Sequence, residues 1–150
     1  MSDPGVRIVR LPSMRVVCAH GFGAEPERIA QEKVDAFVAE KGLMEFRQFG
    51  FNNPNPSPGS PNYGYDIWVT VGPDVESTED VEIKTFAGGL YGVARCEGLR
   101  NIGARWQELA TWREDSGYHV AHHQWLENLL VGPHVPPEDF VFDLYIPIAE

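Results

Sequence analysis

The sequence places one acidic side chain, Glu127, among aromatic and aliphatic residues near its C-terminal end. Trp125 precedes it by two positions and leucines follow it, while Tyr145 lies further on in the apolar run Phe-Asp-Leu-Tyr-Ile-Pro-Ile. A charge buried in apolar surroundings costs free energy unless it is paired or hydrogen-bonded. We interpret Glu127 as the floor of a pocket with aromatic walls, where charge and stacking would bind a ligand. The alternative is a glutamate at the rim that makes ordinary salt bridges at the surface.

The other reactive residues do not form a recognised metal or cofactor site. The histidines in the C-terminal third of the chain are His119, His122, His123 and His134. In a strand, adjacent His122 and His123 would point to opposite faces, and no carboxylate or cysteine spacing completes a ligand set. Cys18 and Cys96 stand far apart and form no Cys-x-x-Cys pair. The sequence therefore predicts neither a metal nor a cofactor.

Composition limits the partners that the chain is expected to have. Its 150 residues fit one domain, 1–150, and 22 acidic against 12 basic side chains give a formal charge of −10. This charge repels phosphate backbones, so direct nucleic-acid binding is disfavoured. No apolar run reaches the ~20 residues that span a bilayer, and the first residues lack a secretory signal. We therefore expect a cytoplasmic protein without membrane contacts.

The periodicity of apolar residues predicts the elements that must position Glu127. Alternating or continuous apolar runs predict strands at 6–20 (interrupted at Pro12-Ser13), 65–71, 81–86, 90–96, 122–130 and 140–148. A hairpin-type turn at Gly88-Gly89 is expected to join two of these strands.

Helices and one long loop complete the prediction. Helical spacing predicts amphipathic helices over 26–41 and from Asn101 to Ser116-Gly117. Segment 49–61 has no period and too many prolines for a paired strand, so we predict a loop that is either a lid or a linker.

The order of these elements predicts an α+β fold made of two similar halves. Each half would be a strand-helix-strand-strand (SHS2-like) unit, with antiparallel strands and a central ligand groove between the halves.

Strand parity selects the side chains that face this groove. The apolar face of the last strand (Phe142, Leu144 and Ile146) is suited to covering helices, which turns Tyr145 the other way. The same reasoning places Trp68, Trp125, Glu127 and Tyr145 on one surface. Tyr91 is a weaker member, and Tyr65, beside the loop, is included in the ligand-binding set. Trp106 and Trp112 of the second helix are assigned to packing.

Several stretches together resemble the GyrI-like effector-binding domain. They are Tyr-Gly-Val-Ala-Arg-Cys-Glu-Gly at 91–98, Trp-Gln-Glu-Leu-Ala-Thr-Trp at 106–112, Ser-Gly-Tyr at 116–118, Glu127, and Asp-Leu-Tyr-Ile-Pro-Ile at 143–148. The resemblance covers essentially the whole chain. The family includes drug-sensing domains of AraC-type and MerR-type transcription regulators and also stand-alone proteins.

This resemblance implies a central groove that binds lipophilic, often cationic, small molecules. It implies a key glutamate, which falls on Glu127, and an aromatic partner on the last strand, which falls on Tyr145. The physics agrees, because a buried carboxylate favours a cation and aromatic faces attract cations. The tyrosine common after that glutamate is replaced here by Asn128-Leu129, so a different ligand preference is expected.

Segment 49–65 resembles stand-alone members of the family. Some of these are hydrolases that open cyclopropane-bearing, DNA-alkylating compounds, a chemistry in which Glu127 could activate water or the leaving group. Three readings therefore stand: a sensor or sequestering protein for lipophilic cations, a hydrolase using the same groove, and a protein that acts through a protein partner.

Overall fold

The computed structural model describes residues 5–53 and 55–150. In this range the chain has two α-helices and antiparallel β-strands, which confirms the α+β class. The chain divides into two compact units. We call Ser13–Ala87 the N-terminal unit, and the residues up to Pro12 together with Gly88–Glu150 the C-terminal unit.

The N-terminal unit is one antiparallel sheet with a helix on one face. Its elements are β2 (Met14–Gly23), α1 (Pro26–Lys41), β3 (Gln48–Asn52), β4 (Tyr63–Thr70) and β5 (Glu82–Phe86). Strand β4 pairs with both β3 and β2, and β5 pairs with the other edge of β2, so the strand order is β3-β4-β2-β5.

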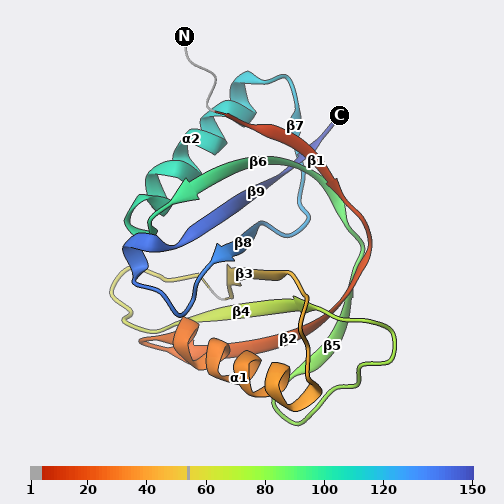
Figure 1. The fold of residues 1–150 in the computed structure, drawn as a ribbon. Coiled ribbons are helices and arrows are strands. Elements are labelled where there is room, and N and C mark those ends of the chain that lie inside the picture. The colour runs from red at the N-terminus through yellow and green to blue at the C-terminus, as the bar shows by residue number, and fades with distance from the viewer. Residues whose placement is uncertain (1–4, 54) are drawn as a thin grey trace. The chain divides into compact units, whose positions relative to one another are not determined.

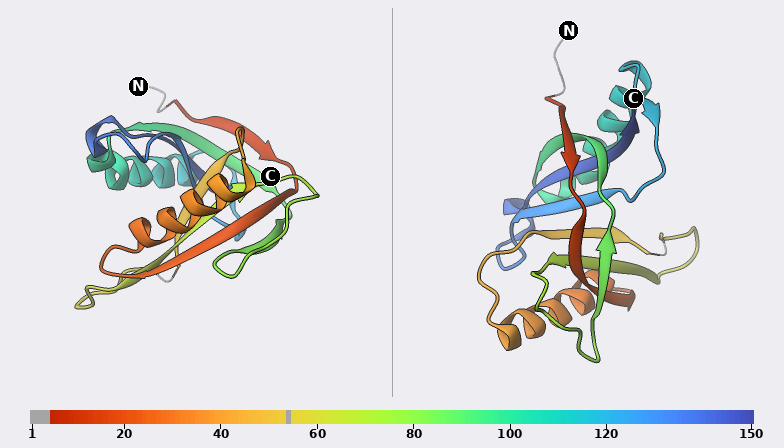
Figure 2. Two further views of the ribbon diagram at one scale, coloured as in Figure 1. Left: turned by 60° about the horizontal axis from the view of Figure 1, so that its bottom comes forward. Right: turned by 90° about the vertical axis from the view of Figure 1, so that its right-hand side faces the viewer.

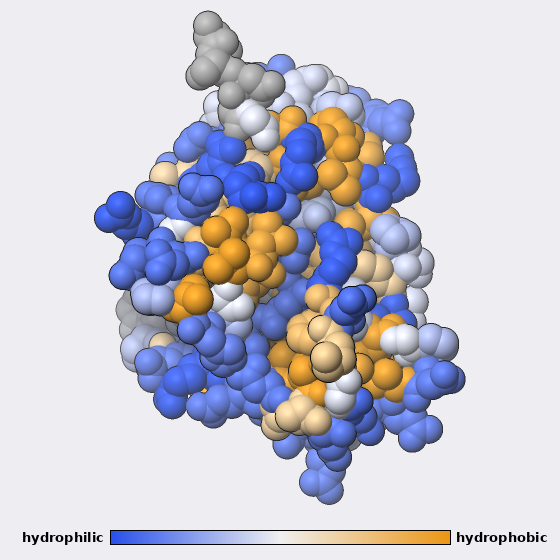
Figure 3. Space-filling model, viewed as in Figure 1, coloured by the Kyte–Doolittle hydropathy of each residue, from blue (hydrophilic) through white to orange (hydrophobic). Residues whose placement is uncertain are grey.

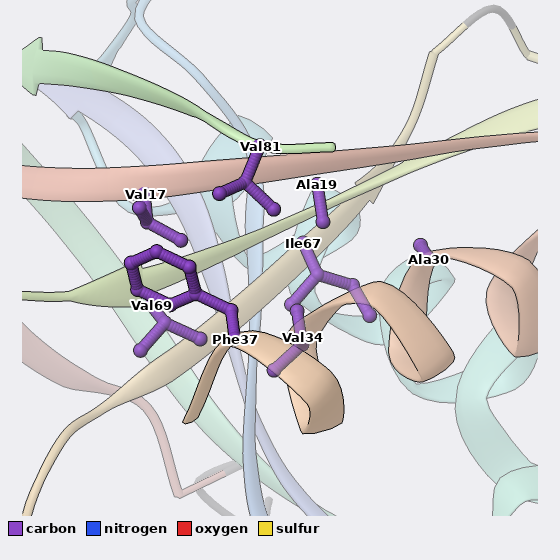
Figure 4. Close-up of a cluster of buried hydrophobic side chains, with 8 residues drawn as sticks. All are labelled: Val17, Ala19, Ala30, Val34, Phe37, Ile67, Val69 and Val81. Atoms are coloured by element: carbon purple, nitrogen blue, oxygen red, sulfur yellow. The ribbon is translucent and has the colours of Figure 1, made fainter. Parts of the chain in front are cut away.

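Helix α1 has the length that its local signals predict. Pro26 opens it, where a missing N–H costs little, and Gly42 ends it with a φ of 64°, a conformation that glycine adopts without strain. Ala30, Val34 and Phe37 recur on one side and pack against the sheet. Figure 4 shows these side chains pointing toward those of β2 and β4, so burial of this apolar stripe holds the helix in place.

The C-terminal unit repeats this arrangement. Its elements are β1 (Arg7–Leu11), β6 (Gly89–Glu97), α2 (Ile102–Asp115), β7 (His119–Val120), β8 (Leu126–Val131) and β9 (Val141–Ala149), with short 3-10 turns at Leu99–Asn101 and Pro137–Asp139. Strand β9 pairs with β6 and β8, β1 pairs with the outer edge of β6, and β7 pairs with the end of β9. Figure 2 shows β1 running beside β6.

Helix α2 covers the apolar face of β6 and β9, as Figure 1 shows. Leu109 is completely buried there, in a cluster with Leu144 and Ile146 of β9. Gly92 of β6 lets the Trp112 ring approach the sheet closely, because a Cβ at this position would collide with that ring. The predicted apolar, helix-facing side of the last strand is therefore confirmed.

The two units share one topology. The series β2-α1-β3-β4 and the series β6-α2-β8-β9 both place their last strand between the other two. The predicted duplication of a strand-helix-strand-strand pattern is confirmed in this sense, with β5 and β1 as additional edge strands.

Three details of the predicted strands are wrong. The predicted strand at 6–20 is two strands, β1 and β2, which belong to different units. Gly88-Gly89 is not a hairpin turn, because β5 pairs with β2 whereas β6 pairs with β1 and β9. The predicted strand at 122–130 begins only at Leu126.

The predicted loop at 49–61 is also partly wrong, because it contains most of β3. Phe49, Gly50 and Phe51 pair with β4, and the irregular segment starts only after Asn52. Residue 54 of the predicted loop lies outside the described residues. Whether the rest of the segment acts as a lid stays a prediction.

The face that Figure 3 shows is predominantly hydrophilic, with local hydrophobic patches. Within the described residues, neither helix combines the length and the apolar character needed to cross a bilayer.

Candidate functional site

Glu127 lies on β8 and points to the face of its sheet that carries α2. Directly opposite residues of an antiparallel pair share a face, and Glu127 is opposite Leu144 of β9. Leu144 belongs to the buried cluster that contains Leu109 of α2. The carboxylate is therefore placed beside the helix, in a partly exposed position.

One indole ring contacts this carboxylate, and a second indole packs against the first. Trp106 of α2 donates a hydrogen bond from Nε1 to Oε2 of Glu127 at 3.3 Å. The Trp106 and Trp125 rings lie 5.3 Å apart between centroids and are tilted by 47°. Trp125 is 39% exposed, so part of its surface is open to solvent. We call Trp106, Trp125 and Glu127 the indole–carboxylate cluster.

Arg113 contacts the same cluster from the last turn of α2. Its guanidinium carbon lies 5.2 Å from the centroid of the Trp125 ring, a cation–π distance. Its Nη1 donates a hydrogen bond to the carbonyl oxygen of Pro147 at 2.9 Å. Trp125 therefore contacts a fixed cation as well as the second indole.

The charge of Glu127 also acts on a buried thiol. Burial raises the pKa of Cys96, and the negative charge of Glu127 raises it further, while Arg105 opposes these effects. Cys96 is buried and behaves as a small apolar side chain, as expected from the sequence.

Tyr145 and Tyr91 lie on the opposite face of the same sheet. Tyr145 is opposite Leu126, one position from Glu127, and therefore points away from α2. Its ring contacts Tyr91 at 5.3 Å, and Tyr91 donates a hydrogen bond to the carbonyl of Gln124 at 2.5 Å. Burial raises the pKa of Tyr91, and the nearby Tyr145 adds to this effect. The prediction that Glu127 and Tyr145 share one surface is thus wrong, since parity within single strands does not give their register.

The Tyr145 face also carries a buried carboxylate, Asp143. Its Oδ1 accepts a hydrogen bond from Nε of Arg95 at 2.7 Å, and its Oδ2 is 2.9 Å from Nη2 of Arg7. Hydrogen bonding to Asp143 raises the pKa of Arg95. Asp143 thus ties β9 to β6 and β1.

Trp68 and Tyr65 belong to the N-terminal unit and lie on opposite faces of its sheet. Trp68 is buried between Phe51 and Phe86, at ring distances of 5.0 and 5.3 Å. Tyr65 lies on the α1 side, where it packs against the apolar cluster and over Gly50. The ligand-binding role of both residues stays a prediction.

A second polar cluster, absent from the predicted set, lies on the Trp68 face. Asp66 is buried, and its two carboxylate oxygens contact Nδ1 of His20 at 2.5 Å and Nδ2 of Asn53 at 2.9 Å. Register places His20 opposite Asp66, just as Arg95 is opposite Asp143 in the other unit. These two aspartates are equivalent positions of the duplication.

The sequence contained a signal for the α2 residues at this site that strand parity did not use. Trp106 and Arg113 are seven residues apart, two helical turns, and therefore lie on one side of α2. Their assignment to Glu127 needed the packing of α2 on β8 and β9, which no local pattern contains.

Comparison with protein families gives a match over residues 7–148, to the Cass2 model described as an integron-associated effector binding protein. The chain belongs to the Cass2 family. Because Cass2 is a GyrI-like family, the resemblance found in the sequence is confirmed. Membership of the Cass2 family, whose members are described as effector binding proteins, supports small-molecule binding as the function of this chain.

Solved structures with the same fold are only distantly related in sequence. A hydrolase from Listeria innocua has 13% identity and a TM-score of 0.72, with 99% of this chain and 94% of that one covered. The integron cassette protein VCH_CASS2 of Vibrio cholerae has 14% identity and a TM-score of 0.56, with coverages of 96% and 95%. SAV2435, solved with bound tetraphenylphosphonium, has 16% identity and a TM-score of 0.54, with coverages of 95% and 93%. Comparison with curated protein sequences gave no match.

Proposed function

We propose that this Cass2-family protein binds a lipophilic cation at the indole–carboxylate cluster. The observation that carries the proposal is the hydrogen bond from the indole of Trp106 to the Glu127 carboxylate, with the Trp125 ring packed against Trp106. Glu127 supplies the negative charge, and Trp106 and Trp125 supply the apolar, electron-rich surface that a lipophilic cation requires.

The chemistry of this cluster favours a cation over a neutral ligand. The negative charge of Glu127 attracts a cation, whereas a neutral ligand gains little from it. Trp125 is large and partly exposed, so covering its ring removes apolar surface from water. The tetraphenylphosphonium bound to SAV2435 is a ligand of this class, and it is therefore a suitable first probe.

The test is a tryptophan-fluorescence titration with tetraphenylphosphonium and with uncharged triphenylphosphine oxide. A cation about 5 Å from the carboxylate, in a setting between water and protein interior, gains about 1–2 kcal/mol. Glu127→Gln keeps the shape and removes the charge, so it is expected to weaken phosphonium binding about tenfold. Binding of the neutral oxide should change much less.

A control variant makes this test specific. Glu108→Gln removes a carboxylate that pairs with Arg105 on the same helix, at 3.0 Å, and it should leave phosphonium affinity unchanged. Equal loss in both variants, or undiminished phosphonium binding by Glu127→Gln, would refute the role of Glu127.

A hydrolase acting at the same residues is the second candidate, and the likeness to the Listeria innocua hydrolase favours it. In this case Glu127, oriented by Trp106, would act as an acid or base toward a cyclopropane-bearing, DNA-alkylating compound. Mass analysis of the ligand after incubation separates the two candidates, because a binding protein returns it intact and a hydrolase returns it with water added.

A further inference from the structure

Arg113 adds a positive charge to a site whose proposed ligand is also positive. The indole–carboxylate cluster has its anion, Glu127, beside Trp106, whereas the cation Arg113 lies against Trp125. The two formal charges cancel, so the cluster is dipolar rather than simply acidic.

Arg113 is held in place by two contacts. Its guanidinium lies on the Trp125 ring, and Nη1 is bonded to the carbonyl oxygen of Pro147, next to the end of the buried core of β9. A ligand that displaced this side chain would have to replace both contacts. The part of Trp125 that Arg113 covers is therefore already occupied by a cation.

We propose that Arg113 is a specificity-determining residue that sets how many charges a ligand carries and where they lie. This inference rests on the proposed function. The Glu127 end accepts a cationic group, and the Arg113 end repels a second cation and attracts an uncharged aromatic or carboxylate-bearing group. The ligands favoured are monocations and zwitterions with an aromatic body, and aromatic dications are disfavoured.

The size of the effect follows from the spacing of the charges. We take a separation of about 7 Å between the far cation of a two-ring dication and the guanidinium, in surroundings intermediate between water and protein interior. The repulsion at this separation corresponds to about tenfold in affinity. A carboxylate at the same place gains by a similar factor.

The experiment compares three biaryl compounds of similar size by calorimetric titration. Methylphenylpyridinium carries one cation, methyl viologen carries two, and carboxyphenyl-methylpyridinium is the zwitterion. Arg113→Gln is expected to raise the affinity for methyl viologen relative to methylphenylpyridinium by about tenfold, and to lower the relative affinity for the zwitterion by a similar factor.

Two further variants separate charge from structure. Arg113→Lys keeps the charge and should keep the order of the three affinities. Arg113→Met also removes the charge but keeps an apolar stem over Trp125, so it should show the same shift in relative affinities that is expected of Arg113→Gln. It serves as the neutral variant if Arg113→Gln is poorly folded. Thermal unfolding of each variant reports on the fold independently of binding.

The outcomes distinguish this inference from the proposed function. Suppose that the compounds bind the wild type, and bind Glu127→Gln more weakly, while both neutral Arg113 variants leave the three relative affinities within about twofold of wild type. This result would refute the role of Arg113 and leave the proposed function standing. If none of the three compounds binds the wild type although tetraphenylphosphonium does, this inference alone is overturned. If tetraphenylphosphonium also fails to bind, the proposed function is overturned with it.

Discussion

Replacing Asp143 by Asn should destabilise the protein markedly, although the two side chains have the same shape. The carboxylate is 8% exposed and bonds two arginines, Arg95 at 2.7 Å and Arg7 at 2.9 Å. An amide has one oxygen, so one guanidinium would face an N–H donor instead of an acceptor.

The expected loss can be estimated from these contacts. A hydrogen bond to a charged group contributes about 1.5–3 kcal/mol, and we take about 1 kcal/mol for each pair because the arginines are 54% and 51% exposed. Two such pairs give a loss of about 2 kcal/mol. For a chain of this length, this loss corresponds to a decrease in Tm of about 4–8 °C.

Urea unfolding followed by circular dichroism measures this loss, with Arg28→Gln as the matched control. Arg28 forms pairs with Glu25 and Glu32 at the surface of α1, where all partners are more than half exposed, so its replacement should cost less than about 0.5 kcal/mol. A double-mutant cycle of Arg7→Gln with Asp143→Asn should give a coupling of about 1 kcal/mol. If Asp143→Asn costs no more than Arg28→Gln, the two arginines do not stabilise the buried carboxylate, and this reasoning fails.

Two further predictions concern glycine and cysteine positions. Gly92→Ala should cost about 1–3 kcal/mol in unfolding free energy, because the new methyl group meets the Trp112 ring. Gly103→Ala on α2 places its methyl group where nothing lies within 4 Å, so it should stabilise the protein by about 0.5–1 kcal/mol. Equal effects of the two variants in urea unfolding would contradict both predictions. Burial and, to a smaller extent, Asp66 raise the pKa of Cys18 from 9.0 to about 11, so the native thiol should resist iodoacetamide at neutral pH and react after denaturation. Rapid labelling of Cys18 in the native protein would contradict this prediction. Because the unfolded thiol ionises at lower pH than the native one, Cys18 also makes the free energy of unfolding fall as pH rises from about 9 to about 11.

The sequence best predicted the elements whose signals lie within a few residues of one another. Helix α1 runs from Pro26 to Lys41 as expected, because a proline start, an apolar stripe and a glycine end all act within a few residues. Strand β3 was hidden because Gly50 interrupts its apolar pattern and the prolines that follow dominate the segment.

The candidate site depended on register, which is a property of two strands together. The sequence correctly grouped Trp125 with Glu127, because both lie on the α2 side. It could not tell that Glu127 is opposite Leu144 rather than Tyr145, and a difference of one residue moves a side chain to the other face. For the same reason Trp106 was assigned to packing although its indole nitrogen contacts the carboxylate.

The duplication also has a consequence for how this protein can change over evolutionary time. When Asp66 is aligned with Asp143, the position of Glu127 in one copy is held by Gly50 in the other. The two copies therefore differ here, and only the C-terminal one carries an acidic group at this place. A side chain at position 50 would meet the hydroxyl end of Tyr65, so a second carboxylate there requires the Tyr65 ring to move aside or to be replaced by a smaller residue. A carboxylate in the N-terminal unit at the place of Glu127 is therefore tied to the position of the Tyr65 side chain.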